Sequence, residues 1–580
     1  MSFSAKQNVS KKVFKKRSIY AAIAAAVSVP AFGQDAPNAG VLQRELELQL
    51  ERSQPSLPVQ PRTPAKPRES KPDEQTLDVK GFKFTGNTLH SSFELEEVVK
   101  PWVGKTIPFS ALNDVTTAVQ EFYFSKNRLV QVTVPPQEVM DGIIELSVVE
   151  GKMGEVSVKQ GKPEQPVRFS DEEVKLYVSA GNDGGQYIDT KALERATMIL
   201  NEVPGVRATV SFEPGEEPGT SDLVAQIEAT PFFSGQVAAT NYGSPSTGAA
   251  QAVANLSLNN ISGIGDQINL DVIQSLGSSY GQMAYNIPIG SGGWKAGVQG
   301  SYLSYQSLSS WSPTPTAGSA NTLNANLSYA LERSQAANST LKFTLENRSY
   351  INTQQGNTIS EYQITAATVG VNGNWASRPG VILNYGATLT LGRLGISNMT
   401  QAGQDETGPG TAGSYGKLAF NISQYRELNI LPNTSWTNSI YGQLANKNLN
   451  SSEQIYMGGP YGVRAYPVAQ GGGSQGAIFT SELNHRLNEN WNIGAFVDIG
   501  VVQQYVRPYP NWQGLTSAAN IYQLADVGLT AKYTYNNLII SAALAFRVGQ
   551  NPLYNSKGEQ LNADNAYRPV QGWLRVSYMF

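Results

Sequence analysis

From residue 231 to the C-terminus the chain consists of short segments in which apolar and polar residues alternate, with almost no helical periodicity. In one segment Ile268, Leu270 and Val272 alternate with polar neighbours, and residues 383–391 repeat the pattern. Alternation with a period of two is typical of a strand with two different faces. An apolar face opposite a small, polar face suits a membrane barrel with lipid outside and water inside. A soluble sandwich or propeller is the alternative that the alternation alone leaves open.

The N-terminus has the pattern of an export signal. Six basic residues stand before an apolar run at 19–29: Lys6, Lys11, Lys12, Lys15, Lys16 and Arg17. The run is too short, and too closely followed by Pro30, for a spanning helix, while Ala31 and Gly33 supply small residues for a cleavage site before Gln34. We predict a signal peptide over residues 1–33 and export to a bacterial envelope; a cytoplasmic basic tail is the alternative.

The last strand of the chain favours the barrel over the soluble alternatives. Counted back from the end, the residues that share one face are Phe580, Tyr578, Val576 and Leu574. We predict that Tyr578 and Phe580 lie in the interface belt where the barrel closes. Because a closed barrel is the only β structure that satisfies every backbone group in lipid, residues 231–580 are predicted to form one barrel of medium to large size, at about 20 residues per strand with its turns. Long loops at 306–318 and 396–414 are predicted to lie outside the cell.

A short helix and a proline-rich linker stand between the signal and the first folded module. Residues 41–54 contain good helix formers, with Leu42, Leu46 and Leu50 at four-residue spacing as a narrow apolar stripe. We assign residues 34–55 to this helix segment. Six prolines between positions 55 and 72 then predict a stiff, extended linker over residues 56–74.

Residues 75–230 are predicted to hold two small α+β modules in tandem. The first, at 75–151, has the order strand, helix, helix, strand, strand, with Ser110 as the cap of its second helix. The same order repeats in the second, at 152–230, where segments 206–212 and 223–228 are expected to pair.

The sequence offers little for catalysis. The pattern Gly-x-Ser-x-Gly occurs around Ser279 and Ser474, but without the strand-turn-helix context that exposes a catalytic serine. The two histidines, His90 and His485, have no metal-ligand partner at useful spacing, and the chain has no cysteine. Gly104, Lys105 and Thr106 match the end of a phosphate-loop motif, but Val99 stands where the motif needs its first glycine. We therefore predict no enzyme activity, no metal and no cofactor, and the net charge of -3 argues against a nucleic-acid partner.

Several short motifs follow one another along the mature chain. They are VPPQEVMDGIIELSVVEG (134–151), NEVPGV (201–206), PGTSDL (218–223), NYGSPSTG (241–248), GIGDQINL (263–270), GVRAYP (462–467) and FVDIG (496–500). In this ordered combination the chain resembles the outer-membrane transporters of two-partner secretion, the TpsB family, which share a superfamily with the outer-membrane insertases. The resemblance covers nearly the whole mature chain.

The resemblance implies an N-terminal plug helix, two periplasmic POTRA modules and a barrel of sixteen antiparallel strands in the bacterial outer membrane. Residues 34–55 would be the plug, which the linker allows to leave the pore while staying attached; an inert N-terminal extension is the alternative. Such transporters carry one large exoprotein of the TpsA type, unfolded, from the periplasm to the cell surface or medium without ATP. An extended exoprotein can add a strand to a POTRA sheet edge. The expected partners are this exoprotein, outer-membrane lipid and the barrel-assembly machinery.

The resemblance also implies a site in the barrel lumen. In the family a V-R-G-Y type loop folds into the barrel, and its arginine meets the aspartate of an F-x-D-x-G strand. The matching residues here are Val463, Arg464 and Tyr466 in the loop, with Ala465 in place of the usual glycine, and Phe496, Asp498 and Gly500 in the strand. The methyl of Ala465 is expected to disfavour a left-handed backbone. We hypothesise that Arg464 pairs with Asp498 and holds the loop; an arginine that only lines a solvated pore is the alternative.

Three functions are compatible with these patterns. Export of one partner protein is the leading interpretation, an insertase for other membrane proteins is the second, and a passive channel or receptor is the third. Two modules instead of a longer array, together with the plug-like helix, favour export. A passive channel would leave the tandem modules without a purpose.

Overall fold

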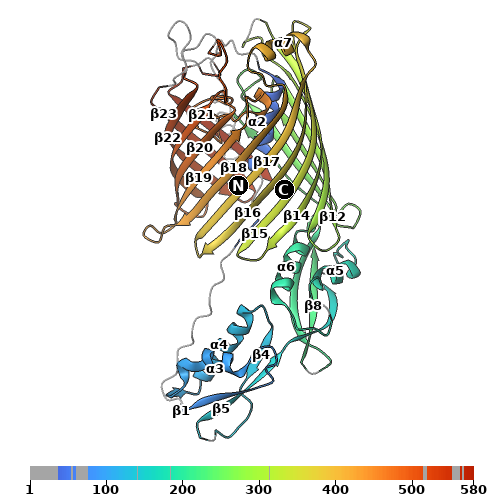
Figure 1. Cartoon of the computed structure of the whole chain (residues 1–580), viewed down its shortest axis with the longest axis vertical. Coiled ribbons are helices and arrows are strands. Elements are labelled where there is room, and N and C mark those ends of the chain that lie inside the picture. Colours follow the sequence, from blue (N-terminus) through green and yellow to red (C-terminus); the bar gives the residue numbers. More distant parts are fainter. Residues whose placement is uncertain are drawn as a thin grey trace, which may run out of the picture.

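A closed barrel of sixteen antiparallel strands, β9 to β24, makes up most of the protein (Figure 1). The computed structural model describes residues 37–53, 57–59, 76–139, 141–162, 164–182, 184–217, 219–311, 314–513, 519–550, 562–564 and 567–580. The predicted barrel and its strand number are confirmed. The predicted signal peptide, 1–33, and most of the predicted linker, 56–74, lie outside the described residues. None of the helices within the described ranges is long and apolar enough to cross a bilayer.

The barrel strands follow one another around the ring in sequence order. Their bounds are β9 Phe233–Thr240, β10 Gln251–Asn259, β11 Gln267–Gln274, β12 Ser278–Ile289, β13 Trp294–Gln306, β14 Thr316–Arg333, β15 Ala337–Gln354, β16 Asn357–Arg378, β17 Val381–Ile396, β18 Gly413–Glu427, β19 Thr434–Ala445, β20 Gln475–Arg486, β21 Trp491–Gln503, β22 Ile521–Tyr535, β23 Leu538–Val548 and β24 Val570–Met579. Strand β16 has 22 residues, about twice the number that crosses a bilayer, so it extends beyond the membrane.

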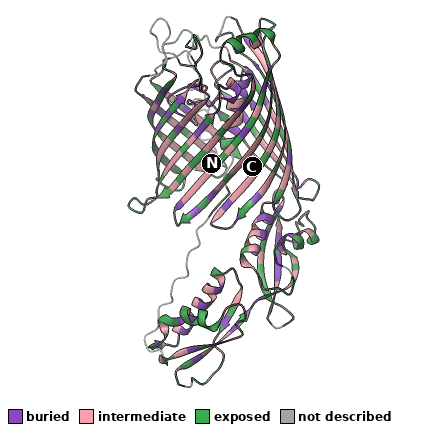
Figure 2. Cartoon of the chain, viewed as in Figure 1, coloured by how far each residue is buried: buried purple, intermediate pink, exposed green. Residues whose placement is uncertain are grey.

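Exposure alternates along the strands, which Figure 2 shows as a change of colour from one position to the next. In β17 Leu389 and Leu391 are exposed on the outer wall, whereas Thr390 between them is buried. The exposed residues face lipid and the buried ones face a filled lumen. The period of two that predicted the strands therefore also separates the two environments.

The last strand closes the ring by pairing with the first, β9. The terminal residue completes the seam: Phe580 N donates to Gly235 O, and Gly235 N donates to Phe580 O, both at 3.0 Å. Tyr578 and Phe580 are exposed on the outer wall, and the Phe580 ring lies 6.5 Å from that of Phe233. Both predicted closing residues thus lie at the seam between β24 and β9.

One of the predicted long loops contains a helix. Between β17 and β18, helix α7 (Met399–Thr407) lies at the end of the barrel away from the modules (Figure 1). Asn398 caps its N-terminus by accepting from Gln401 N, and the buried Asp405 accepts hydrogen bonds from Thr411 and Ala412. This helix was not predicted, because it has only nine residues and its capping groups are local, so it shows little helical periodicity in the sequence.

The first module contains the predicted helices and strands with one addition. Its elements are β1 Thr76–Val79, β2 Gly81–Thr85, α3 Ser92–Val99, η1 Lys100–Trp102, β3 Lys105–Pro108, α4 Ala111–Ser125, β4 Val130–Thr133 and β5 Ile143–Glu150. The predicted first strand is two strands: β2 joins the sheet β2-β5-β4, while β1 pairs with the unpredicted β3. Ser110 is the N-cap residue of α4, as predicted, but its side chain makes no capping hydrogen bond to the helix.

The second module repeats the order without the additional strands. Its elements are β6 Lys152–Gln160, α5 Asp171–Val178, α6 Thr190–Asn201, β7 Val206–Pro214 and β8 Thr220–Ala229, and the sheet order is β6-β8-β7. The expected pairing of the last two strands is confirmed. In both modules the last strand lies in the centre, which leaves β2, β4, β6 and β7 as sheet edges.

A charged junction fixes the second module to the barrel. Glu202, at the end of α6, pairs with Arg333 of β14 and with Lys295 of β13, at 2.9 Å from the lysine. Burial raises the pKa of the Glu202 carboxyl, but Arg333 and Lys295 outweigh this effect and hold that pKa below its usual range. Arg195 of α6 donates to Gly292 O in the turn between β12 and β13 at 3.2 Å and to Ala330 O of β14 at 2.5 Å.

Candidate functional site

Helix α2 (Ala39–Ser53) lies inside the barrel (Figure 1). At its start, Ala39 N donates to Asn352 Oδ1 at 2.8 Å, near the barrel end away from the modules. Beyond its last turn, Asn374 Nδ2 donates to Leu57 O at 2.5 Å, near the end that carries the modules. The 15 residues of the helix rise about 22 Å, so α2 runs through most of the depth of the lumen.

The predicted leucine stripe faces the barrel wall. Leu42, Leu46 and Leu50 are 5%, 5% and 7% exposed. They pack in one cluster with inward side chains of the wall, including Leu303, Tyr305, Tyr350 and Ile364. Burying such a side chain stabilises its position by about 1.5–3 kcal/mol. The apolar stripe therefore holds α2 against one side of the barrel.

Gly40 allows α2 to approach the short helix η2 (Ser451–Glu453), which follows β19. A Cβ atom at position 40 would lie 2.6 Å from Ser452 Cβ and would also collide with the Tyr362 hydroxyl. Both neighbours are themselves buried. Any larger residue at position 40 would push the helix away from this contact.

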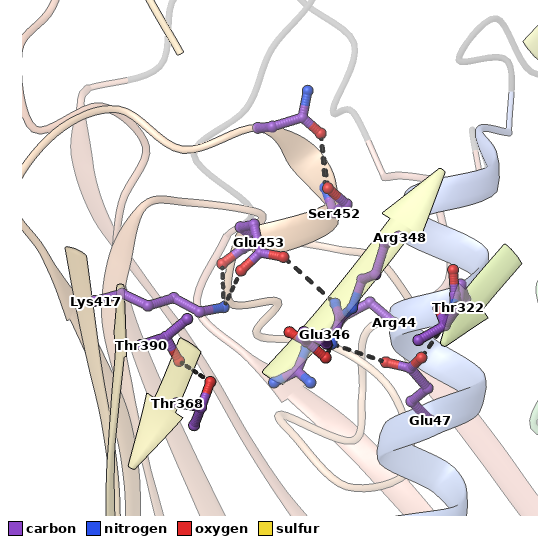
Figure 3. Close-up of polar contacts among 12 residues, drawn as sticks. Arg44, Glu47, Thr322, Glu346, Arg348, Thr368, Thr390, Lys417, Ser452 and Glu453 are labelled. Carbon is purple, nitrogen blue, oxygen red and sulfur yellow. Dashed lines mark hydrogen bonds and ion pairs between the residues drawn. The ribbon is translucent and has the colours of Figure 1, made fainter. Parts of the chain in front are cut away.

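Five charged side chains form a network between α2, the wall and η2 (Figure 3). Arg348 of β15 lies 3.8 Å from Glu47 of α2, 2.9 Å from Glu346 and 3.4 Å from Glu453. Lys417 of β18 lies 2.7 Å from Glu453. Buried charges are tolerated only when they are paired, so this network ties the helix to two different strands through Arg348 and Glu453.

Residues 454–474, between η2 and β20, form a loop that folds into the lumen. Val463 N donates to Met457 O at 2.7 Å, and Ile455 and Gly473 form a two-way bridge at the base of the loop. Val463, Ala465 and Tyr466 are at most 1% exposed. The inward loop and α2 together fill the lumen, with a cavity of about 70 Å³ between them.

Arg464 is the centre of the contacts between the loop and the wall. Its Nε donates to Asp498 Oδ2 at 2.8 Å, and its Nη2 donates to Asp498 Oδ1 at 3.1 Å. Its Nη1 donates to Glu482 Oε2 at 2.8 Å, and its guanidinium lies 3.3 Å from the centre of the Phe496 ring. Trp573 Nε1 donates to Arg464 O at 2.7 Å. The guanidinium thus meets one carboxylate in the bidentate geometry that arginine favours and a second carboxylate at its far end.

Ala465 is accommodated without strain. Its φ is not positive, so the left-handed backbone that a methyl group disfavours is not needed there. In this loop the non-glycine residue with a positive φ is Ala469, whose φ is 61°. Ala465 N donates to Asp526 Oδ2 at 2.5 Å, which gives the loop a third carboxylate contact.

Gly500 has a steric role. A Cβ at this position of β21 would lie 2.9 Å from Val463 Cγ2 and 3.0 Å from Met457 Sδ. Its absence lets the loop lie against the wall. The structure therefore brings the loop motif Val463, Arg464, Ala465, Tyr466 together with Phe496, Asp498 and Gly500, and it places the leucine stripe against another part of the wall.

Several residues of the lumen site were not found from sequence. They are Glu482, Asp526 and Trp573 around the loop, and Glu47, Glu346, Arg348, Lys417 and Glu453 around the helix. One signal was available: a charge in the middle of a strand whose other face meets lipid must point into the lumen. Among the described residues, no group of three or more acidic or histidine side chains is arranged to hold a metal ion.

The fold and the lumen together define a class of protein. The membrane barrel is closed, its lumen is filled by a helix and an inward loop, and two α+β modules lie at its periplasmic end. These features define an outer-membrane protein transporter of the two-partner secretion type. The chain belongs to the family of haemolysin secretion/activation proteins ShlB/FhaC/HecB, whose model matches residues 219–520. The model of the ShlB-type POTRA domain matches residues 77–151. The protein is therefore an outer-membrane transporter that secretes a partner exoprotein, with its POTRA modules in the periplasm.

Individual relatives agree with this assignment. The heme/hemopexin transporter protein HuxB of Haemophilus influenzae is 26% identical over 595 residues, which cover 98% of this chain and all of the relative. The outer membrane transporter CdiB of Dickeya dadantii is 23% identical over 70% of this chain and 71% of its own length. The solved structure of CdiB from Escherichia coli, 19% identical, matches with a TM-score of 0.66 over 94% of this chain and all of that chain. BamA of Haemophilus ducreyi, 13% identical, shares the fold with a TM-score of 0.54 over 87% of this chain and all of that chain.

Proposed function

We propose that the structure is the closed state of the transporter and that export begins when α2 leaves the lumen. The observation that carries the proposal is the position of α2, which occupies the path along the barrel axis, while Leu57 beyond it contacts Asn374 near the end that carries the modules. An unfolded exoprotein needs the same space. Arg464 and its carboxylate partners keep the inward loop on the wall during this change, so the helix is the part that moves.

The POTRA modules supply the first contact with the exoprotein in this mechanism. Edge strands β4 and β7 have unpaired backbone groups that can bind an extended chain of almost any sequence. When the N-terminal segment of the exoprotein is added to the full transporter, amide hydrogen exchange in β4 or β7 should become slower. Unchanged exchange in both would count against capture by strand addition. Barrel insertion by the barrel-assembly machinery, guided by Tyr578 and Phe580, completes the proposed set of partners.

A reversible cross-link tests whether α2 must leave. Gln43 Nε2 donates to Thr322 Oγ1 at 2.5 Å, and the chain has no cysteine of its own. The pair Gln43→Cys and Thr322→Cys can therefore be joined by a short bifunctional methanethiosulfonate and released by a reducing agent. We expect the cross-linked transporter to secrete at least tenfold less exoprotein, and reduction to restore secretion.

The matched control joins two residues of the wall. Ser301 and Thr322 are directly opposite each other on β13 and β14, and Ser301 also lies near Gln43. A cross-link between Ser301→Cys and Thr322→Cys leaves α2 unattached and should leave secretion intact. Normal secretion by the Gln43–Thr322 cross-linked protein would refute the proposed exit of α2.

A further inference from the structure

A trough of about 980 Å³ lies on the outer wall of the barrel across strands β14 to β18. Its floor is made of small residues, Ala325, Ala367 and Gly416. Leu323, Leu345 and Leu391 line its sides and are 66%, 66% and 60% exposed. The floor and the sides together form an apolar depression on a surface that faces lipid.

The trough ends at a row of polar residues on the side of the barrel away from the modules. Arg393 follows Leu391 on the outer face of β17, and the strand register places it directly opposite Thr365 of β16 and Ser414 of β18. Thr365 in turn lies opposite Asn347 of β15. About ten residues of a tilted strand cross the hydrocarbon, so a strand that begins at Val381 leaves it near Leu391. The polar row therefore lies at the level of the lipid headgroups.

Arg393 differs from three of the cations inside the barrel. Arg348, Lys417 and Arg464 each contact at least one carboxylate. Arg393 is exposed, and no carboxylate in the described part of the chain forms an ion pair with it. An arginine on the lipid face costs free energy in the hydrocarbon and little at the interface, where an anionic headgroup can pair with it.

The polar neighbours of Arg393 are held in place by one another. Asn347 Nδ2 donates to Thr365 Oγ1 at 3.0 Å, and Gln363 Nε2 donates to Asn347 Oδ1 at 2.9 Å. Asn446 accepts from Gly416 N at 3.0 Å through Oδ1, and its Nδ2 lies 3.5 Å from the position of a Cβ on Gly416. An amide donor and a guanidinium thus border the same end of the trough.

We propose that this trough binds one phosphorylated lipid of the outer leaflet, of the lipid A type. An acyl chain fills the apolar depression between Leu345 and Leu391, and a phosphate group of the lipid pairs with Arg393 and accepts from Asn446. Apolar contact and a charged hydrogen bond act together, so neither an uncharged lipid nor a free phosphate ion satisfies the whole site. The proposal concerns the outer wall and does not depend on how the exoprotein passes through the lumen.

Native mass spectrometry of the detergent-solubilised full-length transporter can test this site. Diphosphorylated lipid A is expected to bind with a stoichiometry of one, and dephosphorylated lipid A is expected to bind at least tenfold more weakly because it lacks the partner of Arg393. Arg393→Gln should lose the same tenfold preference, and Arg393→Lys should keep most of it. Gly416→Leu, which fills the floor, should weaken both lipids equally.

Arg426 provides the matched control, because it is an exposed arginine on the adjacent strand β18 at the periplasmic end of the barrel. Arg426→Gln should bind lipid A like the unaltered protein. Barrel closure in every variant is checked by heat-modifiable migration. Equal binding of the two lipids, an unchanged preference in Arg393→Gln, or inorganic phosphate competing as well as the lipid would each overturn the proposal.

Discussion

Replacing Arg464 should release the inward loop more completely than neutralising its main partner, Asp498. Arg464 contacts two carboxylates directly, those of Asp498 and Glu482. Asp498 is fully buried, and Glu482 beside it is partly buried. Arg464→Met therefore leaves these two carboxylates without their shared counter-ion, and breaking a buried pair in this way costs about 3–5 kcal/mol.

Asp498→Asn should cost less. The amide oxygen still accepts a hydrogen bond, and Arg464 keeps Glu482 at 2.8 Å. The loss is then close to that of one charge-assisted hydrogen bond, about 1.5–3 kcal/mol. In the double variant the asparagine removes one of the charges that the lost arginine left uncompensated, so its cost should be smaller than the sum of the two single costs.

Amide hydrogen exchange of residues 455–473 in the full transporter measures the free energy of local opening, and secretion of the exoprotein measures the functional consequence. We expect Arg464→Met to open the loop roughly tenfold or more beyond Asp498→Asn. An equal or larger effect of Asp498→Asn would refute the argument that Arg464 compensates two carboxylates. The charge-swapped pair Arg464→Asp with Asp498→Arg is a poor test, because the carboxylate introduced at position 464 would face Glu482.

Three further predictions concern the plug helix and the module junction. Glu453→Gln removes a buried carboxylate that pairs with Lys417 and Arg348, so α2 and η2 should separate more readily. Cells that carry this variant should become more sensitive to large antibiotics. The control Glu489→Gln, on an exposed turn, should have no effect. Gly40→Val should displace α2 from Ser452 and raise the ion conductance of the purified transporter in planar bilayers, with Gly403→Val in α7, where a Cβ meets no neighbour, as the unaffected control. Because the pKa of Glu202 is lowered in the folded state, its contribution to docking of the second POTRA module is complete above the ordinary carboxylate range and is lost as the pH falls through the lowered value. Cross-linking between this module and the barrel should fall on acidification below about pH 4, and Glu202→Gln should dock weakly at every pH; a docking equilibrium in Glu202→Gln that keeps the full acid dependence would rule out this carboxylate as its cause.

The barrel could be predicted from the chain because its cause is local. Lipid outside and water inside impose a period of two on every strand, so the pattern at Leu389 and Leu391 is visible without knowledge of any neighbour. The two modules were predictable for the same reason, since capping residues such as Ser91 and Ser170 and the apolar spacing of each helix act within a few residues. The separation of β1 from β2, the strand β3 and the helix α7 were missed. Strand β3 forms because it pairs with β1, as Thr106 and Asp78 do across 28 positions, and α7 depends on its own short caps.

The residues of the lumen site also fall into two groups, those that the sequence could identify and those that it could not. The motif residues Arg464 and Asp498 could be named because the chain resembles a family, and the leucine stripe of α2 follows from its four-residue spacing. Neither source could supply the Arg348–Glu453 pair, because charges that lie 105 positions apart meet only after the ring has closed. The sequence by itself therefore determined the strand period, the modules and the apolar face of the helix, all of which depend on contacts with solvent or lipid. The tertiary structure alone decided which charged residues meet in the lumen, because strand pairing around the barrel brings together residues that are far apart in the sequence.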